Sequence, residues 1–136
     1  MTLSIDNPFL EWMGVRLTEW SEGRAEMRLD FGPQLGNRTG RIQGGVMCTL
    51  LDAVAGYAGL WTPPGLPTRQ SVTLSLTTHF VDYAEGRTLI ARGVVERQGR
   101  GLYFTRSEVW VDDSLRVASA IGTFKYRRPV ADPPGA

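Results

Sequence analysis

The chain has 136 residues, and its 15 basic and 14 acidic side chains leave a formal net charge of +1. This length suits one compact domain, which we place at residues 1–128, and the 42% share of hydrophobic residues excludes a disordered chain. Because the charges nearly balance and the chain has only one cysteine and one histidine, we expect no nucleic acid partner, no internal disulfide and no metal site.

The N-terminal part of the chain predicts a short helix followed by two strands. Asn7 and Pro8 predict a helix over residues 8–13, because asparagine caps helices and proline is favoured at the first helical position. Residues 15–20 alternate weakly, whereas residues 24–31 place apolar side chains on one face and charged ones on the other. No basic segment followed by an apolar run opens the chain, so we expect no secretory signal and a reducing, cytoplasmic location.

The next element is a long apolar segment that is almost free of charge. Between Arg41 and Arg69 the only charged residue is Asp52. From Gly44 to about Trp61 the apolar side chains cover every face, which predicts a helix that is buried on most sides. A membrane span needs about 20 apolar residues without a central carboxylate, so we expect no membrane partner.

The rest of the chain predicts a β-sheet. Strands are expected at residues 71–81, 89–97, 102–111 and 115–126, with tight turns between the last three. Residues 129–136, which are rich in proline and alanine, are expected to be disordered. Short connections favour antiparallel pairing, and the whole pattern predicts an α+β fold in which one sheet wraps around one buried helix.

Asp52 is the first candidate for a functional residue. An ionised carboxylate in an apolar helix is costly unless a hydrogen bond, a charge or solvent compensates it. The helical neighbours three and four positions away are small, which favours a cleft where another molecule approaches. The alternative interpretation is that Asp52 only faces water on one exposed side of the helix.

Gln43, Gly44 and Gly45 lie at the expected N-terminus of the same helix. Backbone N–H groups in a first helical turn are free and carry a partial positive charge, and glycine lets a carbonyl oxygen approach them closely. These residues therefore have the form of an oxyanion hole, although a pair of glycines alone usually marks a tight turn.

Two weaker signals remain open. Cys48 and His79 could form a nucleophilic pair, but a cysteine in an apolar helix is more often a small core residue. Arg97, Arg100 and Arg106 gather on one hairpin, where they form either a solvated edge or a contact to phosphate.

Several of these residues together resemble a known family. Asn37, the Gln-Gly-Gly-Val run at residues 43–46 and Leu-Asp at residues 51–52 are similar to the Asn…His-Gly-Gly…Asp signature of hotdog-fold acyl-CoA thioesterases. The resemblance is to the PaaI-like branch, related to phenylacetate degradation, and extends over residues 7–124. It implies a curved antiparallel sheet around a central helix. It also implies a homodimer or a homotetramer of paired dimers, with active sites at the subunit interface.

The resemblance implies hydrolysis of an acyl-CoA substrate without a metal or organic cofactor. Asp52 would be the general base or nucleophile, and the backbone N–H of Gly44 would polarise the thioester carbonyl. Asn37 would orient the attacking water or the thioester. Thr73 of the partner subunit would hold that water, with Ser71 as the alternative because the alignment is open by a residue or two.

The remaining site residues follow from the same resemblance. Gln43 stands where the family usually has histidine, and we interpret its side chain as a brace for the loop. Gly45, Arg97 and Arg100 are assigned to substrate binding, the arginines as contacts to the CoA phosphates. The walls of the acyl pocket are expected to include the following residues: Tyr57, Leu60 and Trp61.

Two other functions are compatible with parts of the pattern. Gln43 favours a hotdog module that binds acyl-CoA or serves only assembly, whereas the retained Asp52 and Asn37 argue against it. A hydratase would need a histidine beside the carboxylate, and the only histidine, His79, does not lie at a matching position.

Overall fold

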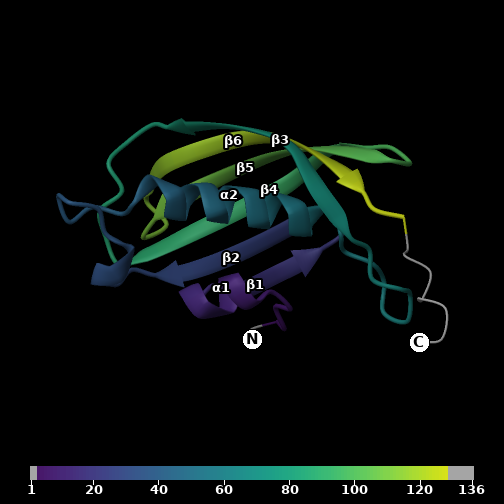
Figure 1. Ribbon diagram of the computed structural model, residues 1–136, viewed down its shortest axis with the longest axis horizontal. Helices are drawn as coiled ribbons and strands as arrows, with labels where there is room; N and C mark the ends of the chain where they lie inside the picture. Colours follow the sequence, from purple (N-terminus) through teal and green to yellow (C-terminus); the bar gives the residue numbers. More distant parts are fainter. Residues whose placement is uncertain (1–2, 129–136) are drawn as a thin grey trace.

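The computed structural model describes residues 3–128 as two α-helices and a six-stranded antiparallel sheet (Figure 1). In chain order the elements are α1 (Pro8–Met13), β1 (Arg16–Ser21), β2 (Arg24–Asp30), the 3₁₀ helix η1 (Pro33–Leu35), α2 (Gly44–Ala58), β3 (Ser71–Phe80), β4 (Thr88–Gln98), β5 (Leu102–Val111) and β6 (Leu115–Tyr126). This order confirms the prediction, except for η1, where no helix was expected. The disorder expected at residues 129–136 lies outside the described residues.

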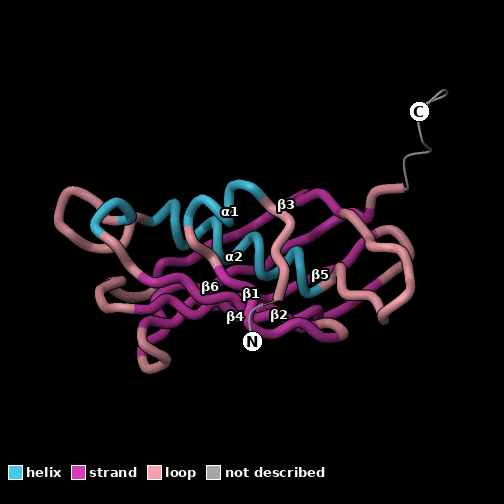
Figure 2. The backbone as a smooth tube through the Cα atoms, turned by 90° about the horizontal axis from the view of Figure 1, so that it is seen from below, coloured by secondary structure: helices cyan, strands magenta, loops and turns pink. Residues whose placement is uncertain are grey.

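The sheet has the strand order β1-β2-β4-β5-β6-β3, so β1 and β3 form its two edges. Every neighbouring pair is antiparallel. The sheet curls around α2, which contacts all six strands, and both helices lie on its concave side (Figures 1 and 2). This is the curved sheet around a central helix that the resemblance implies.

Helix α2 is shorter than expected because it ends at Ala58 rather than near Trp61. The last carbonyl groups of a helix lack partners within it. Here aromatic side chains of the sheet supply the hydrogen bonds. The bonds are Tyr103 Oη to Gly56 O (2.8 Å), Trp20 Nε1 to Tyr57 O (2.7 Å) and Tyr126 Oη to Gly59 O (2.7 Å). These bonds tie the C-terminal end of α2 to β1, β5 and β6.

Gly93 of β4 marks the closest approach between α2 and the sheet. A Cβ atom at this position would stand 2.7 Å from Val54 O and 3.1 Å from Ala55 N. Since real Cβ atoms do not come so near to a backbone oxygen, only glycine permits α2 to lie this close to β4.

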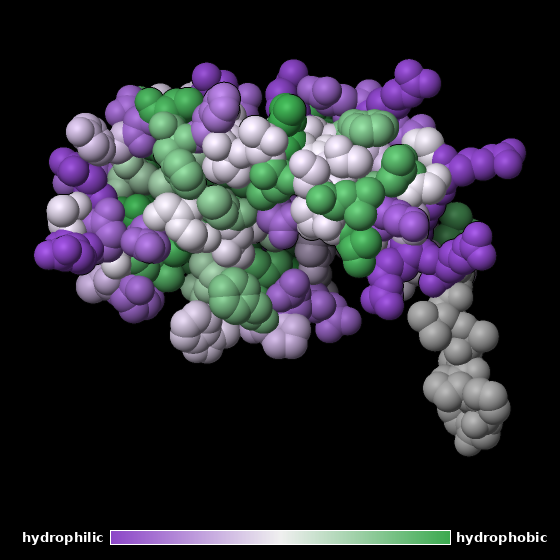
Figure 3. Space-filling view, turned by 45° about the horizontal axis from the view of Figure 1, so that its top comes forward, coloured by the Kyte–Doolittle hydropathy of each residue, from purple (hydrophilic) through white to green (hydrophobic). Residues whose placement is uncertain are grey.

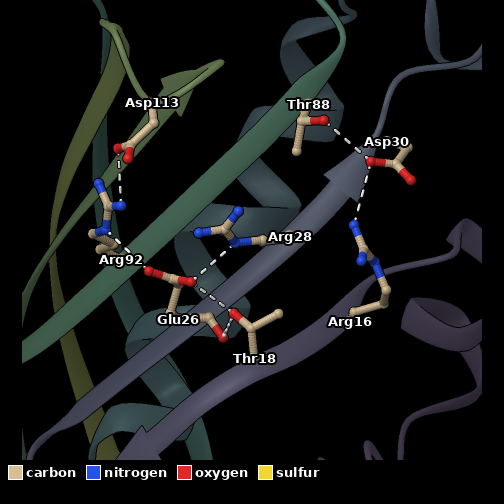
Figure 4. A network of polar contacts seen from close by, with 8 residues as sticks. All are labelled: Arg16, Thr18, Glu26, Arg28, Asp30, Thr88, Arg92 and Asp113. Carbon is tan, nitrogen blue, oxygen red and sulfur yellow. Dashed lines mark hydrogen bonds and ion pairs between the residues drawn. The ribbon is translucent and has the colours of Figure 1, made fainter. Parts of the chain in front are cut away.

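Glu26 is buried on the face of β2 that points away from α2, where the alternation placed the charged side chains. Its carboxylate accepts hydrogen bonds from Thr18 Oγ1 (2.8 Å), Arg28 Nε (3.1 Å) and Arg92 Nε (3.2 Å) (Figure 4). Arg92 also pairs with Asp113 at 2.9 Å. Burial acts to raise the pKa of Glu26, but the hydrogen bonds from Thr18, Arg28 and Arg92 outweigh it and leave the pKa below its ordinary value.

Candidate active site

Asp52 lies in the second half of α2, half-buried on the side of the helix that the sheet leaves open. Its Oδ1 accepts a hydrogen bond of 2.7 Å from Thr73 Oγ1, which lies in β3 of the same chain. No ion pair within residues 3–128 involves this carboxylate. A hydroxyl and an open cleft therefore compensate the charge that the sequence places in an apolar helix.

The contact between Asp52 and Thr73 differs from what the resemblance implies, which assigns Thr73 to the partner subunit. The reason is the pairing of β3 with β6 in the same chain, where Thr73 faces Phe124. That pairing brings the inward side of β3 over α2. A threonine from a second copy is therefore not needed to hold Asp52.

A cleft of about 740 Å³ adjoins Asp52. It lies between α1, the C-terminal half of α2 and the segment that leads into β3. Asp52, Thr73 and Ser71 line the cleft together with several large apolar side chains. The apolar lining consists of Phe9, Leu10, Trp20, Tyr57, Leu60 and Phe124. Tyr57 and Leu60 were expected as pocket walls, whereas Trp61 does not line the cleft.

Ser71 is bonded to a buried tyrosine rather than to Asp52. Its Oγ lies 2.8 Å from Tyr103 Oη, and Tyr103 Oη donates to Gly56 O at 2.8 Å. Because a phenol has one proton, the hydroxyl of Ser71 is the donor of the first bond. Burial raises the pKa of Tyr103 to about 12, which keeps its proton in place. Of the two candidates, Thr73 is therefore the residue that contacts Asp52.

The N-terminus of α2 lies away from this cleft. Gln43 donates its backbone N–H to Leu35 O at 2.9 Å, and its exposed side chain forms no hydrogen bond within residues 3–128. Gly44 and Gly45 follow as the first helical residues, whose N–H groups have no acceptor inside the helix. A Cβ atom on Gly44 would stand 3.5 Å from the ring of Phe80, which lies at the end of β3.

Gly44 and Asp52 of one chain cannot act on the same thioester. Asp52 is eight positions after Gly44 in the helix, which corresponds to roughly 12 Å along the axis. The N–H groups of the first turn also point out of the N-terminus, away from Asp52. A carbonyl bound at Gly44 would therefore lie farther from Asp52 than the glycine itself.

Asn37 organises the loop that precedes α2. Its Oδ1 accepts hydrogen bonds from Thr39 N (2.9 Å), Thr39 Oγ1 (2.8 Å) and Arg41 N (3.1 Å). Its Nδ2 group forms no hydrogen bond to the residues that the structure describes. Asn37 thus has a structural role through its oxygen and keeps an exposed amide as a free donor.

The arginines at the cleft are not those selected from the sequence. Arg97 and Arg100 are exposed at the β4–β5 turn and do not line the cleft, whereas Arg69 and Arg127 do. Arg69 precedes β3 and Arg127 follows β6, so only the pairing of these two strands brings them together. That pairing joins distant parts of the chain, and no local pattern indicates it.

The described residues do not form the other kinds of site that were considered. No hydrogen bond joins Cys48 to His79 in the part of the chain that the structure describes. Over the same residues, no three histidine, cysteine, aspartate or glutamate side chains come together as a metal site. None of the described helices has the length and hydrophobicity required to cross a membrane.

Comparison with protein families supplies the family of the chain. The model of the thioesterase superfamily matches residues 39–118, which include α2 with Asp52 and most of the sheet. The chain belongs to the thioesterase superfamily. It is therefore a thioester hydrolase by family, and its curved sheet around one long helix is the hotdog fold.

Several known proteins are similar to this superfamily member over most of its length. A Bacillus halodurans protein, solved with CoA, is 28% identical with a TM-score of 0.78 over 91% of this chain and 81% of its own. The PaaI protein of the Escherichia coli phenylacetic acid degradation operon is 21% identical with a TM-score of 0.79 over 90% and 86%, and it shares the fold. A candidate esterase of Mycobacterium tuberculosis is 26% identical over 86% of this chain and 84% of that protein.

Proposed function

We propose that this thioesterase hydrolyses an acyl-CoA to a carboxylic acid and free CoA, with Asp52 as its general base or nucleophile. The observation that carries the proposal is the Asp52 carboxylate, held by Thr73 at 2.7 Å and open to the cleft. The CoA in the similar Bacillus halodurans structure supports CoA as the leaving group. The reaction needs neither a metal nor an organic cofactor.

In the general-base route, Asp52 removes a proton from a water molecule as that water attacks the thioester carbonyl. The C–S bond then breaks, and the proton passes to the departing thiolate of CoA. In the nucleophilic route, Asp52 attacks directly and water hydrolyses the mixed anhydride that forms. Both routes consume one water and release the acid and the thiol. Both also develop negative charge on the carbonyl oxygen, which requires hydrogen-bond donors.

We assign these donors to a second copy of the chain, namely the Gly44 N–H and the free amide of Asn37 of the partner subunit. The basis is the edge strand β3, in which Thr73 contacts Asp52 near one end and Phe80 adjoins Gly44 at the other. If two β3 edges pair antiparallel about a twofold axis, the end of one strand lies beside the start of the other. The α2 N-terminus of one copy is then close to Asp52 of its partner.

The surface of β3 supports this pairing. It is a ten-residue edge strand, and long exposed edges tend to pair with another chain. Val72, Leu74 and Phe80 are 43%, 55% and 53% exposed, and Figure 3 shows hydrophobic side chains among the polar ones with this side turned forward. The proposed assembly is a homodimer or a homotetramer of such dimers. With its single Cys48, it suits a reducing, cytoplasmic setting.

The test is thiol release from a panel of acyl-CoAs that differ in the acyl group. We expect the wild-type protein to release CoA from at least one of them, and Asp52→Asn to abolish this release without changing the melting temperature or the oligomeric state. Release at nearly the wild-type rate by Asp52→Asn would contradict the role of Asp52.

A second candidate function is a non-catalytic module that binds acyl-CoA. Gln43 is the observation in its favour, because the family usually has histidine there and the Gln43 side chain forms no hydrogen bond within the described residues. Binding of CoA without thiol release from any member of the panel would support this function over hydrolysis.

A further inference from the structure

One end of the cleft carries two arginines from neighbouring chain segments. Arg69 lies in the loop before β3, two positions ahead of the first strand residue, and Arg127 directly follows β6. Ser71 and Tyr126 are paired in register, and Arg127 N donates to Gln70 O at 2.9 Å. Both arginines therefore line the cleft that contains Asp52.

No acidic side chain within the described part of the chain neutralises either guanidinium. No ion pair within residues 3–128 involves Arg69 or Arg127. The other acidic residue that lines the cleft, Asp6, also forms no ion pair over this range. In contrast, Arg28 and Arg92 share the carboxylate of Glu26 on the other face of the sheet.

The guanidinium of Arg69 is nevertheless held in place. It lies 3.4 Å from the centre of the Tyr126 ring, and the Tyr126 hydroxyl is fixed by bonds to Gly59 O and Gln98 Nε2. A cation held over an aromatic ring keeps its in-plane N–H groups free for an acceptor. Arg69 and Arg127 carry like charges in one cleft, and an anion bound between them would relieve their repulsion.

The position of these arginines relates them to the substrate of the proposed thioesterase. Thr73 is four positions after Arg69 in the sequence, so their Cα atoms lie at most about 14 Å apart. An arginine side chain adds further reach, and a single molecule can therefore place its thioester at Asp52 and an anionic group at Arg69. Acyl-CoA carries such groups as the phosphates of its nucleotide, and some acyl groups carry a carboxylate.

We propose that Arg69 and Arg127 bind an anionic group, phosphate or carboxylate, of the acyl-CoA whose thioester lies at Asp52. This proposal rests on the proposed function and replaces Arg97 and Arg100 as the charged contacts. Charge-assisted hydrogen bonds from guanidinium groups to phosphate or carboxylate are among the stronger polar contacts in proteins.

The test compares Arg69→Gln, Arg127→Gln and the double variant with Arg87→Gln. Arg87 is the matched control, because it is exposed, lies outside the cleft and forms no ion pair within the described chain. We expect each cleft variant to raise the KM for its best acyl-CoA about tenfold with kcat within about twofold, since the lost contact is remote from the reacting carbonyl. Arg87→Gln should leave both constants unchanged.

Two substrate pairs distinguish the sources of the anion. If the anion is a CoA phosphate, the KM increase disappears when benzoyl-CoA is replaced by benzoyl-pantetheine, which has no nucleotide. If it is an acyl carboxylate, the wild-type protein prefers adipyl-pantetheine to hexanoyl-pantetheine and the variants lose that preference. Either result supports the proposal. Unchanged constants in the double variant, or a KM increase in Arg97→Gln and Arg100→Gln instead, would overturn it.

Direct binding keeps the proposal separate from catalysis. Titration calorimetry with CoA, dephospho-CoA and adipate measures the anion site in the absence of turnover. If the wild-type protein hydrolyses no thioester but binds one of these probes about tenfold more tightly than the double variant, hydrolysis fails and the anion site stands. If it hydrolyses acyl-CoA and the double variant binds every probe equally well, the anion site fails and hydrolysis stands.

Discussion

Asp52 remains accessible in an otherwise apolar helix because its neighbours on that face are small and because it lines the cleft. The Thr73 hydroxyl donates to Oδ1, and no hydrogen bond from residues 3–128 engages Oδ2, which can accept a proton or attack a carbonyl carbon. A carboxylate with one oxygen fixed and the other exposed has the geometry required of a general base or nucleophile. The charge that breaks the apolar pattern thus also lines the cleft.

The hydroxyl of Thr73 should position Asp52 rather than carry the reaction. Thr73→Val keeps the shape of the side chain but removes the donor, and we expect kcat to fall about tenfold because a hydrogen bond to a charged group is lost. Thr73→Ser, which keeps the hydroxyl, should stay within about threefold of wild type. Steady-state kinetics with one acyl-CoA measures both; equal losses in the two variants would contradict the role of the hydroxyl.

Gly44 offers a direct test of the backbone donor. Proline is well tolerated at the first helical position, and Gln43 already has the extended backbone (φ −62°, ψ 135°) that precedes proline, so Gly44→Pro removes the N–H with little strain. We expect a loss of about 100-fold in kcat. Gly44→Ala keeps the N–H and makes only ordinary contact with Phe80 at 3.5 Å, so it should retain most activity. A fully active Gly44→Pro enzyme would exclude this donor.

At the scale of single residues, the sequence predicts the features that a local sequence pattern determines. Asp52 and Gly44 could be selected as candidates because an isolated charge and a glycine pair stand out within one helix. The contact of Thr73 with Asp52 of the same chain could not be predicted, and neither could the arginines of the cleft. Both features depend on the pairing of β3 with β6. Asn37 was found from the resemblance, but its turn-forming oxygen is visible only in the folded loop.

At the scale of elements, the site depends on how closely α2 lies against the sheet. Gly93 permits that approach, and Gly93→Ala would place a methyl group 2.7 Å from Val54 O. We expect this substitution to lower the free energy of unfolding by about 1–3 kcal/mol. Gly101→Ala, where a Cβ atom meets nothing within 4 Å, is the matched control and should leave stability nearly unchanged. Denaturant unfolding compares the two, and equal stabilities would contradict the tight packing.

The Glu26 network makes the outer side of β2 sensitive to pH. Because the pKa of Glu26 is lowered from 4.5, its carboxylate stabilises the fold above that pH, and this stabilisation is lost as pH falls through the lowered pKa. The difference in unfolding free energy between wild type and Glu26→Gln should therefore be constant near neutral pH and shrink below pH 4.5. Glu96→Gln, which removes an exposed pair with Arg106, should show a much smaller difference. A pH-independent difference for Glu26→Gln would contradict the network.

The elements themselves were largely predictable, because apolar periodicity and turn residues are local. The structure confirms strands at Leu102–Val111 and Leu115–Tyr126 with the expected bounds and the helix at Pro8–Met13 with Asn7 as its cap. The end of α2 was not predicted, since three hydrogen bonds from distant strands determine where its carbonyl groups are satisfied. The burial of Glu26 was also not predicted. An alternating pattern indicates on which face of a strand a side chain lies, but not whether neighbouring side chains cover that face.

At the scale of the whole molecule, we propose that one chain supplies only part of a thioesterase site. Asp52 and Thr73 lie at one end of the inner side of β3, and Gly44 adjoins the other end. Each chain therefore contributes one half to each of two sites if two β3 edges pair about a twofold axis. On this account a monomer is inactive, and disruption of the β3 edge should abolish hydrolysis without unfolding the subunit.

Complementation between two inactive variants tests this account most directly. Asp52→Ala lacks the carboxylate and Gly44→Pro lacks the donor, so each should be inactive alone. Random exchange of their subunits makes about half of the dimers mixed, and each mixed dimer has one intact site, which predicts recovery of about a quarter of the wild-type activity. If mixed dimers form, as shown by capture on a tag carried by one variant, and thiol release does not recover, Asp52 and Gly44 do not act from different subunits on one thioester.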